Sequence, residues 1–174
     1  MVDAHALLIR AGRNADAHYR YLSAVLQNTN ERTASWAVRS IMSLDPGNPA
    51  RSNAVERCFE FFDSGRDEWA VEYAAQGFSQ FGPQDKEYVP RLIKIISQPP
   101  TKERVRAVCS AIGALGNIGP GARGAVPQLQ AIADRKIQAP EDWEGTPLAY
   151  RSETPYQKAA ADALEKIRGG EGKP

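Results

Sequence analysis

The fold is specified most clearly by two stretches of the chain: FGPQDKEYVPRLIKII at residues 81–96 and IGPGARGAVPQLQAIA at residues 118–133. Laid over one another at an offset of 37 residues, they align without a gap. Glycine, proline and aliphatic residues recur in the pairs Gly82/Gly119, Pro83/Pro120, Val89/Val126, Pro90/Pro127 and Leu92/Leu129. Self-similarity at a fixed period of this size is typical of a repeat architecture.

The same register extends along the chain in both directions. Another step of 37 residues towards the N-terminus gives four apolar columns: Ala37/Ala74/Ala111, Ile41/Phe78/Leu115, Leu44/Phe81/Ile118 and Phe59/Ile96/Ala133. A further step reaches residues 7–26, where the match is weak. Towards the C-terminus, residues 156–167 align at an offset of 49, which leaves extra residues within 135–154. The members of the columns in this last copy are Ala160, Leu164 and Ile167.

Within each repeat the apolar residues follow the period of an amphipathic helix. Residues 105–118 and 122–133 carry them at spacings of three and four, and no segment shows the sustained alternation of a strand. Pro90 and Pro127 stand near the start of a second helix, where a missing N–H is tolerated. We therefore predict an all-α chain of helical hairpins that must stack to bury their apolar faces. The predicted helices cover 3–11, 14–28, 32–44, 50–63, 67–81, 85–97, 102–118, 123–136 and 154–168.

The stretch VRAVCSAIGALGNIGPGARGAVPQLQAIAD, residues 105–134, resembles a HEAT repeat of the bacterial HEAT-like type, with A-L-G-x-I-G-P followed by A-V-P-x-L. The resemblance is strongest over 67–136, extends to 154–168, and is only positional over 33–63, where Asp45 replaces the glycine. It implies a right-handed α-solenoid of about four hairpins with a role in protein–protein interaction. HEAT-like members also include phycobilin lyases and a DNA glycosylase group, but no stretch here matches the catalytic positions of either.

We predict one solenoid domain over 1–170, with an inserted loop at 137–153 and a flexible tail at 171–174. The weak pattern of the first unit and the glycine-rich tail also permit the chain to be a fragment of a longer array.

Composition points to an ordinary globular protein, with 42% hydrophobic and 25% charged residues. The net charge of +1 gives no overall attraction to nucleic acid or membrane. Charge is nevertheless segregated: residues 56–85 hold seven acids and two bases, whereas 86–136 hold nine bases and three acids. Two cysteines make no disulfide framework. With no signal peptide or membrane span in the sequence, we expect a cytoplasmic protein.

The glycine-rich turn of the repeat contains a G-x-G-x-x-G pattern at Gly119, Gly121 and Gly124. A dinucleotide-binding loop with this pattern follows a strand, whereas here a helix is predicted before it. We therefore interpret Gly119 as the residue that ends a helix in the αL conformation.

Candidate catalytic and metal-ligating residues are few. His5 and His18 are 13 residues apart with no ligand at a suitable spacing, and His18 falls in the apolar column of Val55, so a partly buried core histidine is favoured. Cys58 and Cys109 occupy apolar stripes and are interpreted as packing residues. We expect no catalytic residues, no metal and no cofactor.

Three cations recur at the offset of 37 in the predicted second helices: Arg20, Arg57 and Lys94, with Ala131 as the fourth member. We call these three the cation column. Stacked second helices lie about 8–10 Å apart and line the concave face of a solenoid. The column, with Arg91 one turn away, therefore predicts a groove for an acidic peptide, with a phosphate backbone as the second candidate ligand. The alternative is a solvated face in which Arg57 pairs with Glu60.

The inserted loop 137–153 is a second candidate for binding. It carries Trp143 and Tyr150 among prolines, glycines and acids. It is either a cover for the end of the stack or a recognition loop. Trp36 and Trp69, near the starts of first helices, are interpreted as packing residues.

The sequence as a whole predicts a scaffold or accessory subunit that binds a protein partner on its second helices. The candidate binding residues are Arg20, Arg57, Arg91, Lys94, Trp143 and Tyr150. Two alternatives are a nucleic-acid-binding module that uses the basic segment 86–136 and a HEAT-like lyase or glycosylase. Self-association is a further alternative, and no membrane partner is expected.

Overall fold

The structure, a computed structural model, describes residues 15–44, 50–64, 68–138 and 155–169, and all regular structure within these ranges is helical. The chain divides into two compact units, Met1–Gln80 and Phe81–Pro174, here called the N-terminal and C-terminal units. The predicted helix 3–11, nearly all of the loop 137–153 and the tail 171–174 lie outside the described residues. The single domain predicted over 1–170 remains a prediction. None of the described helices combines the length and apolar character that crossing a bilayer requires.

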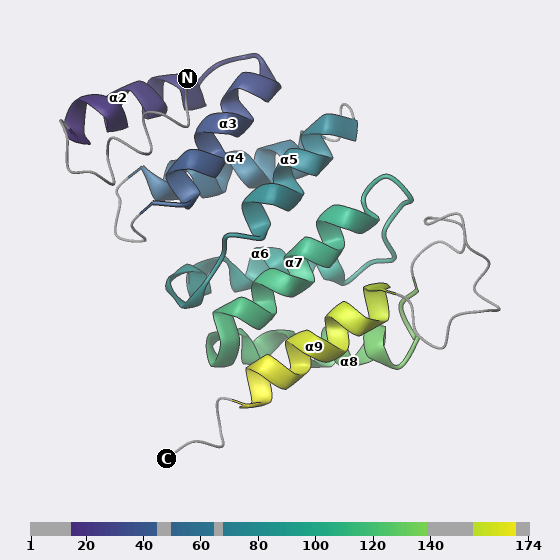
Figure 1. Ribbon diagram of the computed structural model, residues 1–174. Coiled ribbons are helices and arrows are strands. Elements are labelled where there is room, and N and C mark those ends of the chain that lie inside the picture. The colour runs from purple at the N-terminus through teal and green to yellow at the C-terminus, as the bar shows by residue number, and fades with distance from the viewer. Residues whose placement is uncertain (1–14, 45–49, 65–67, 139–154, 170–174) are drawn as a thin grey trace. The chain divides into compact units, whose positions relative to one another are not determined.

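The N-terminal unit contains α2 (Ala15–Leu26), α3 (Glu31–Met42), α4 (Arg51–Ser64) and α5 (Glu68–Phe78). Helix α3 packs against α2, α4 and α5, and α4 also packs against α5 (Figure 1). The side chain of Asn30 caps α3 by accepting a hydrogen bond from the Thr33 N–H at 3.0 Å. An aromatic cluster joins α4 to α5, with the rings of Phe59 and Phe78 5.2 Å apart.

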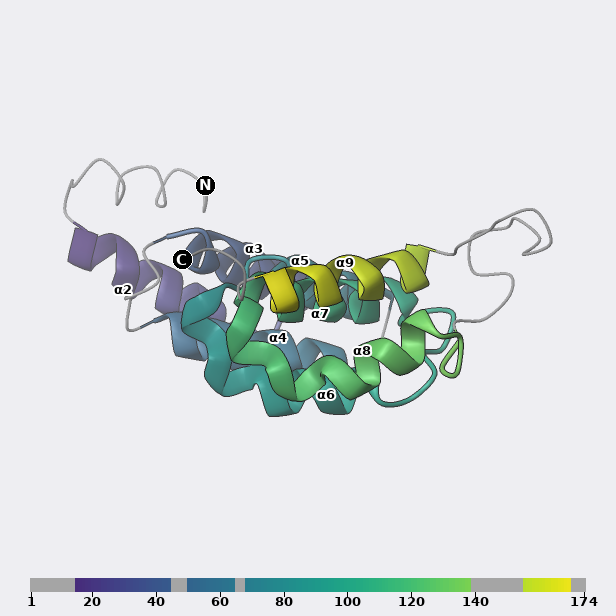
Figure 2. The same cartoon turned by 90° about the horizontal axis from the view of Figure 1, so that it is seen from below.

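The C-terminal unit contains the 3₁₀ helices η1 (Pro83–Tyr88) and η2 (Gly119–Ala125) and four α-helices. These are α6 (Val89–Ile96), α7 (Val105–Ile118), α8 (Val126–Ala133) and α9 (Pro155–Gly169). Figure 2 shows α7 and α9 side by side in one layer of this unit, and α6 and α8 in the other. The sequence predicted α-helix from residue 123; instead, a proline near the start of each 3₁₀ helix leads the chain into a tighter turn that precedes the second helix.

The offset of 37 recurs in the backbone. Helices α3, α5 and α7 begin at residues 31, 68 and 105, and α6 and α8 at residues 89 and 126. Asp85 has φ −96° and ψ 20°, and its counterpart Ala122 has φ −98° and ψ 17°. Val89 and Val126 agree as closely, at −51°/−44° and −54°/−43°. The two turns therefore follow the same path although their side chains differ.

Burial confirms the predicted core columns. The alanine column, Ala37, Ala74, Ala111 and Ala160, has no exposed surface. The other columns are buried as well, in the residues Ile41, Phe78, Leu115, Leu164, Leu44, Phe81, Ile118, Ile167, Phe59 and Ile96. Ala133 is the exception and is half-buried. Trp36, predicted to pack, exposes 41% of its surface and stacks with the Arg39 guanidinium at 5.6 Å.

Two glycines serve different purposes. Gly119 ends α7 with φ 69° and ψ −137°, a positive φ that favours glycine, although ψ lies far from the predicted αL value. Gly77 allows α5 to approach α4, because a Cβ atom at this position would lie 2.1 Å from Cys58 Sγ and 3.5 Å from Val38 Cγ1. Gly77 is therefore required by packing and not by backbone conformation.

We expect Gly77→Ala to lower the free energy of unfolding by about 1–3 kcal/mol, the usual effect of overpacking a core. Combining it with Cys58→Ala removes the offending sulfur and should restore part of that loss, measured as a coupling energy in a denaturant-unfolding cycle.

Gly113→Ala is the matched control, because Gly113 lies inside α7 and a Cβ added there would have no atom within 4 Å. This change should raise stability by roughly 0.5–1 kcal/mol through helix propensity. Equal losses of stability in Gly77→Ala and Gly113→Ala would contradict the close contact between Gly77 and Cys58. The absence of a coupling energy between these two positions would contradict it as well.

Candidate functional site

The candidate binding residues on second helices belong to different units. Arg20 on α2 and Arg57 on α4 lie in the N-terminal unit, whereas Arg91 and Lys94 lie on α6 in the C-terminal unit. Arg20 and Lys94 are exposed, and Arg57 and Arg91 are half-buried. Trp143 and Tyr150 lie outside the described residues.

The guanidinium of Arg57 is held by contacts within the N-terminal unit. Its Nη1 lies 2.6 Å from Glu60 Oε2, the pairing that the spacing predicts as the alternative to a binding role. Its Nη2 donates to the carbonyl oxygen of Asn28 at 3.3 Å, and its Cζ lies 4.9 Å from the centre of the Phe61 ring. These contacts join α4 to the chain just after α2, so they give Arg57 a structural role.

The two units differ in the charge around these cations. Helix α4, which carries Arg57, exposes the acids Glu56, Glu60 and Asp63, and Glu60 is the one paired with Arg57. Helix α6 contains no acid among its own residues and carries Arg91 and Lys94, whereas the exposed Glu87 lies in η1 just before it. By its own residues α6 is therefore positively charged, whereas α4 has more acids than bases.

His18 and the cysteines lie apart from any described cluster of ligands. His18 is half-buried, Cys58 is fully buried and Cys109 is half-buried. Within the described ranges, no three His, Cys, Asp or Glu side chains are grouped so that they could hold a metal ion.

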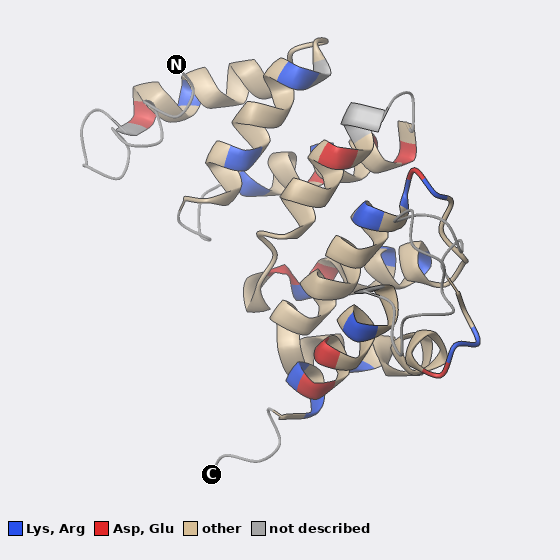
Figure 3. Cartoon of the chain, turned by 45° about the vertical axis from the view of Figure 1, so that its right-hand side comes forward, with Lys and Arg blue, Asp and Glu red and all other residues tan. Residues whose placement is uncertain are grey.

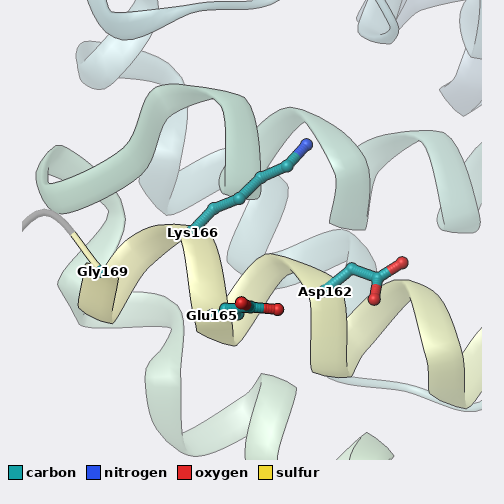
Figure 4. Close-up of a pocket in the computed structure, with 4 residues that line it drawn as sticks. All are labelled: Asp162, Glu165, Lys166 and Gly169. Carbon is teal, nitrogen blue, oxygen red and sulfur yellow. The ribbon is translucent and has the colours of Figure 1, made fainter.

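A surface depression on α9 is lined by Asp162, Glu165, Lys166 and Gly169 (Figure 4). All four residues are exposed. Lys166 extends towards α7, where its Nζ donates to Asn117 Oδ1 at 3.1 Å, whereas the two acids point elsewhere. Exposed charges of both signs on an open surface lack the enclosure typical of a small-molecule site.

Arg51 is a charged residue that no pattern in the sequence singles out. Only 5% of its surface is exposed, yet it carries a permanent charge. Its Nη1 donates to the Met42 carbonyl oxygen at 2.9 Å and its Nη2 to the Gln80 carbonyl oxygen at 3.1 Å. These carbonyls end α3 and follow α5, where helices leave acceptors unsatisfied and carry partial negative charge. One guanidinium thus caps two helices.

Asp85 is a second buried charge with a capping role, exposed by only 3%. Its Oδ2 accepts from the Gly82 N–H at 2.9 Å and from Gln84 Nε2 at 3.0 Å. The sequence places Asp85 in the acidic segment, but its carboxylate satisfies the start of η1 instead of facing a partner. A signal was present in the spacing, since an acid three residues after the turn glycine can supply one half of a capping box, the hydrogen bond to the N–H of the N-cap residue.

Tyr156 on α9 is fully buried, and within the described part of the chain its hydroxyl has no hydrogen-bond partner. Burial raises the pKa of Tyr156 far above its ordinary value of 10.0, and the neighbouring Cys109 adds to the shift. At pH values just above 10.0, the Tyr156 hydroxyl therefore stays protonated in the folded protein, whereas the same tyrosine in the unfolded chain ionises.

Arg51→Met should lower the free energy of unfolding by about 2–4 kcal/mol, because both carbonyls lose a charged donor inside the protein. Arg51→Lys should give a smaller loss, since an ammonium group lacks the fork that reaches two acceptors. Denaturant unfolding measures both, with the exposed Arg32→Met on α3 as control; a loss at position 51 no larger than at position 32 would contradict the double cap.

The raised pKa of Tyr156 predicts a loss of stability in alkali. The contribution of Tyr156 to the free energy of unfolding is complete below pH 10.0, the pKa of tyrosine in the unfolded chain. It falls as the pH rises above that value, by about 1.4 kcal/mol per pH unit. Tyr156→Phe should remove this part of the slope and leave stability near neutral pH unchanged or slightly higher. The exposed Tyr21→Phe is the control and should keep the slope; unfolding curves across the alkaline range give the comparison.

Comparison with protein-family models, curated protein sequences and solved structures gave no match. The assignment of a function therefore depends on the residues and geometry of this chain.

Proposed function

We propose that this protein is a scaffold or accessory subunit, built as an α-solenoid of HEAT-like hairpins, that binds a protein partner through its second helices. The observation that carries the proposal is the recurrence of helix starts and turn torsions at 37 residues. Repeats that differ in side chains but keep one backbone path are typical of solenoids, whose exposed surfaces serve binding.

Packing within each unit supports the solenoid. First helices pack on first helices, α3 on α5 and α7 on α9, and the second helices α6 and α8 pack on each other. This is the layered arrangement expected when each hairpin buries its apolar face against the next. The handedness and the membership in HEAT-like repeats come from the sequence resemblance.

Charge supports the choice of an acidic partner segment. Helix α6 presents Arg91 and Lys94 three residues apart, and no acid lies on that helix. On α2, Arg20 is exposed and available to the same kind of ligand. Trp143 and Tyr150 are retained in the proposal as residues of the inserted loop, because aromatic side chains are enriched at interfaces.

The test begins with affinity capture from the native source and identification of the bound protein. Calorimetry with the purified partner then compares the wild-type chain with Arg91→Glu/Lys94→Glu. We expect binding to weaken at least roughly tenfold and to depend less on salt, since like charge now faces the acidic segment.

Lys86→Glu/Arg123→Glu is the matched control, because these cations lie in η1 and η2 and not on α6. It should bind as the wild type does. Unchanged affinity and salt dependence in the α6 variant would refute the proposed surface, and capture of nucleic acid without protein would refute the proposed class of partner.

A further inference from the structure

One exposed side of α3, in the N-terminal unit, combines a tryptophan with two arginines. Arg32, Trp36 and Arg39 lie four and three residues apart, so they share one side of the helix. All three are exposed, whereas the side that includes Ala37 and Ile41 is buried in the core. Trp36 exposes 41% of its surface, and Arg39 Cζ lies 5.6 Å from the centre of its ring. We call these three residues the α3 stripe.

The repeat shows that packing does not require a large residue at position 36. The counterparts of Trp36 in the later copies are Tyr73, Ser110 and Ala159. Ser110 and Ala159 are half-buried, so small side chains are sufficient in this column. Tyr73 is half-buried as well, with its ring centre 6.1 Å from that of Phe61. Trp36 therefore leaves in water a large apolar surface that the fold does not need at this position.

The residue types of the α3 stripe are those that carry most of the energy in protein–protein interfaces. Tryptophan, tyrosine and arginine are enriched among the residues whose truncation weakens binding most. The guanidinium of Arg39 over the indole also restricts the orientation of Trp36 before a partner arrives. An anchor that is ordered in advance loses less conformational entropy on binding.

Charge indicates what kind of protein segment fits. The α3 stripe carries two positive charges, one on each side of Trp36 along the helix, and no acid (Figure 3). A complementary segment therefore carries acids on both sides of an apolar group. A second copy bound through the same stripe would place arginine against arginine, because an isologous interface uses one patch twice. Pairing of two α3 stripes is therefore disfavoured.

The surroundings of α3 favour a protein over a nucleic acid or a membrane. None of the helices that pack on α3 has an excess of cations: α2 has one charge of each sign, α4 has more acids than bases, and α5 has two acids and no base. A track of phosphates would therefore find no continuation beyond α3. A helix at a membrane surface buries its whole apolar face in the lipid, whereas that face of α3 is buried in the unit.

We propose that the α3 stripe binds a segment of a partner protein in which acidic residues lie on both sides of one apolar side chain. The apolar side chain packs on the indole of Trp36, and the acids pair with Arg32 and Arg39, about one helical turn away on either side. A guanidinium has five N–H donors, so Arg39 can stack on Trp36 and bind a carboxylate together. This surface lies on a first helix and is independent of the second-helix surface of the proposed function.

The test selects binders from a displayed library of random 12-residue peptides on the full wild-type chain and removes those that also bind Trp36→Ser. We expect the enriched peptides to carry acids on both sides of an aromatic or aliphatic residue. Calorimetry with one such synthetic peptide should show binding at least roughly thirtyfold weaker for Trp36→Ser, the usual effect of truncating a dominant interface residue. Arg32→Gln, which keeps the indole, should weaken binding up to roughly fivefold and reduce its salt dependence.

Three variants separate this surface from the fold and from α6. Trp36→Ser introduces the residue that α7 has in the same column, so its denaturation midpoint should stay near that of the wild type. Tyr21→Ser removes the other large hydrophobic side chain exposed among the described residues and should bind the peptide normally. Arg91→Glu/Lys94→Glu should also bind it normally, so that this proposal and the proposed function of α6 fail or succeed separately.

Three results would overturn the proposal. The first is a selection that yields no peptide able to distinguish the wild type from Trp36→Ser. The second is a set of enriched peptides without acids, or an equal loss of binding in Tyr21→Ser. The third is binding of phosphatidylglycerol vesicles or of a single-stranded oligonucleotide that Trp36→Ser abolishes while peptide binding is unchanged, which would assign the stripe to a membrane or a nucleic acid.

Discussion

The architecture rests on helices that pack closely on one another at buried positions occupied by alanine or glycine. The alanine column is fully buried from Ala37 to Ala160, and Gly77 lies against Cys58 where α5 packs on α4. In the C-terminal unit, a Cβ on Gly116 would lie 3.0 Å from the Ala163 Cα where α7 packs on α9. A single hairpin of short helices buries too little apolar surface to be stable alone. Close packing against the neighbouring hairpins buries the rest of that surface and stabilises each hairpin.

Close packing of helices creates a second requirement, because their ends are then buried as well. Each helix leaves carbonyl groups without partners at its C-terminus, and a buried acceptor without a donor is destabilising. Arg51 resolves this for α3 and α5 together, and Asp85 does the equivalent for the N–H groups of η1. Each of the two charged side chains is buried beside backbone groups of opposite polarity, which is why neither is available to a partner.

The all-helical class, the register of 37 residues and the buried columns follow from the amino-acid sequence alone, because helical period and apolar character act locally and recur in every repeat. The pairing of Arg57 with Glu60, three residues apart on one helix, is readable in the same way. Tertiary packing was needed to show that Arg51 reaches the carbonyls of Met42 and Gln80. This outcome depends on contacts between segments some 30 residues apart, for which no local pattern exists. The periodicity that predicts the core carries no information about Arg51, because its counterparts in the next two repeats are Tyr88 and Ala125.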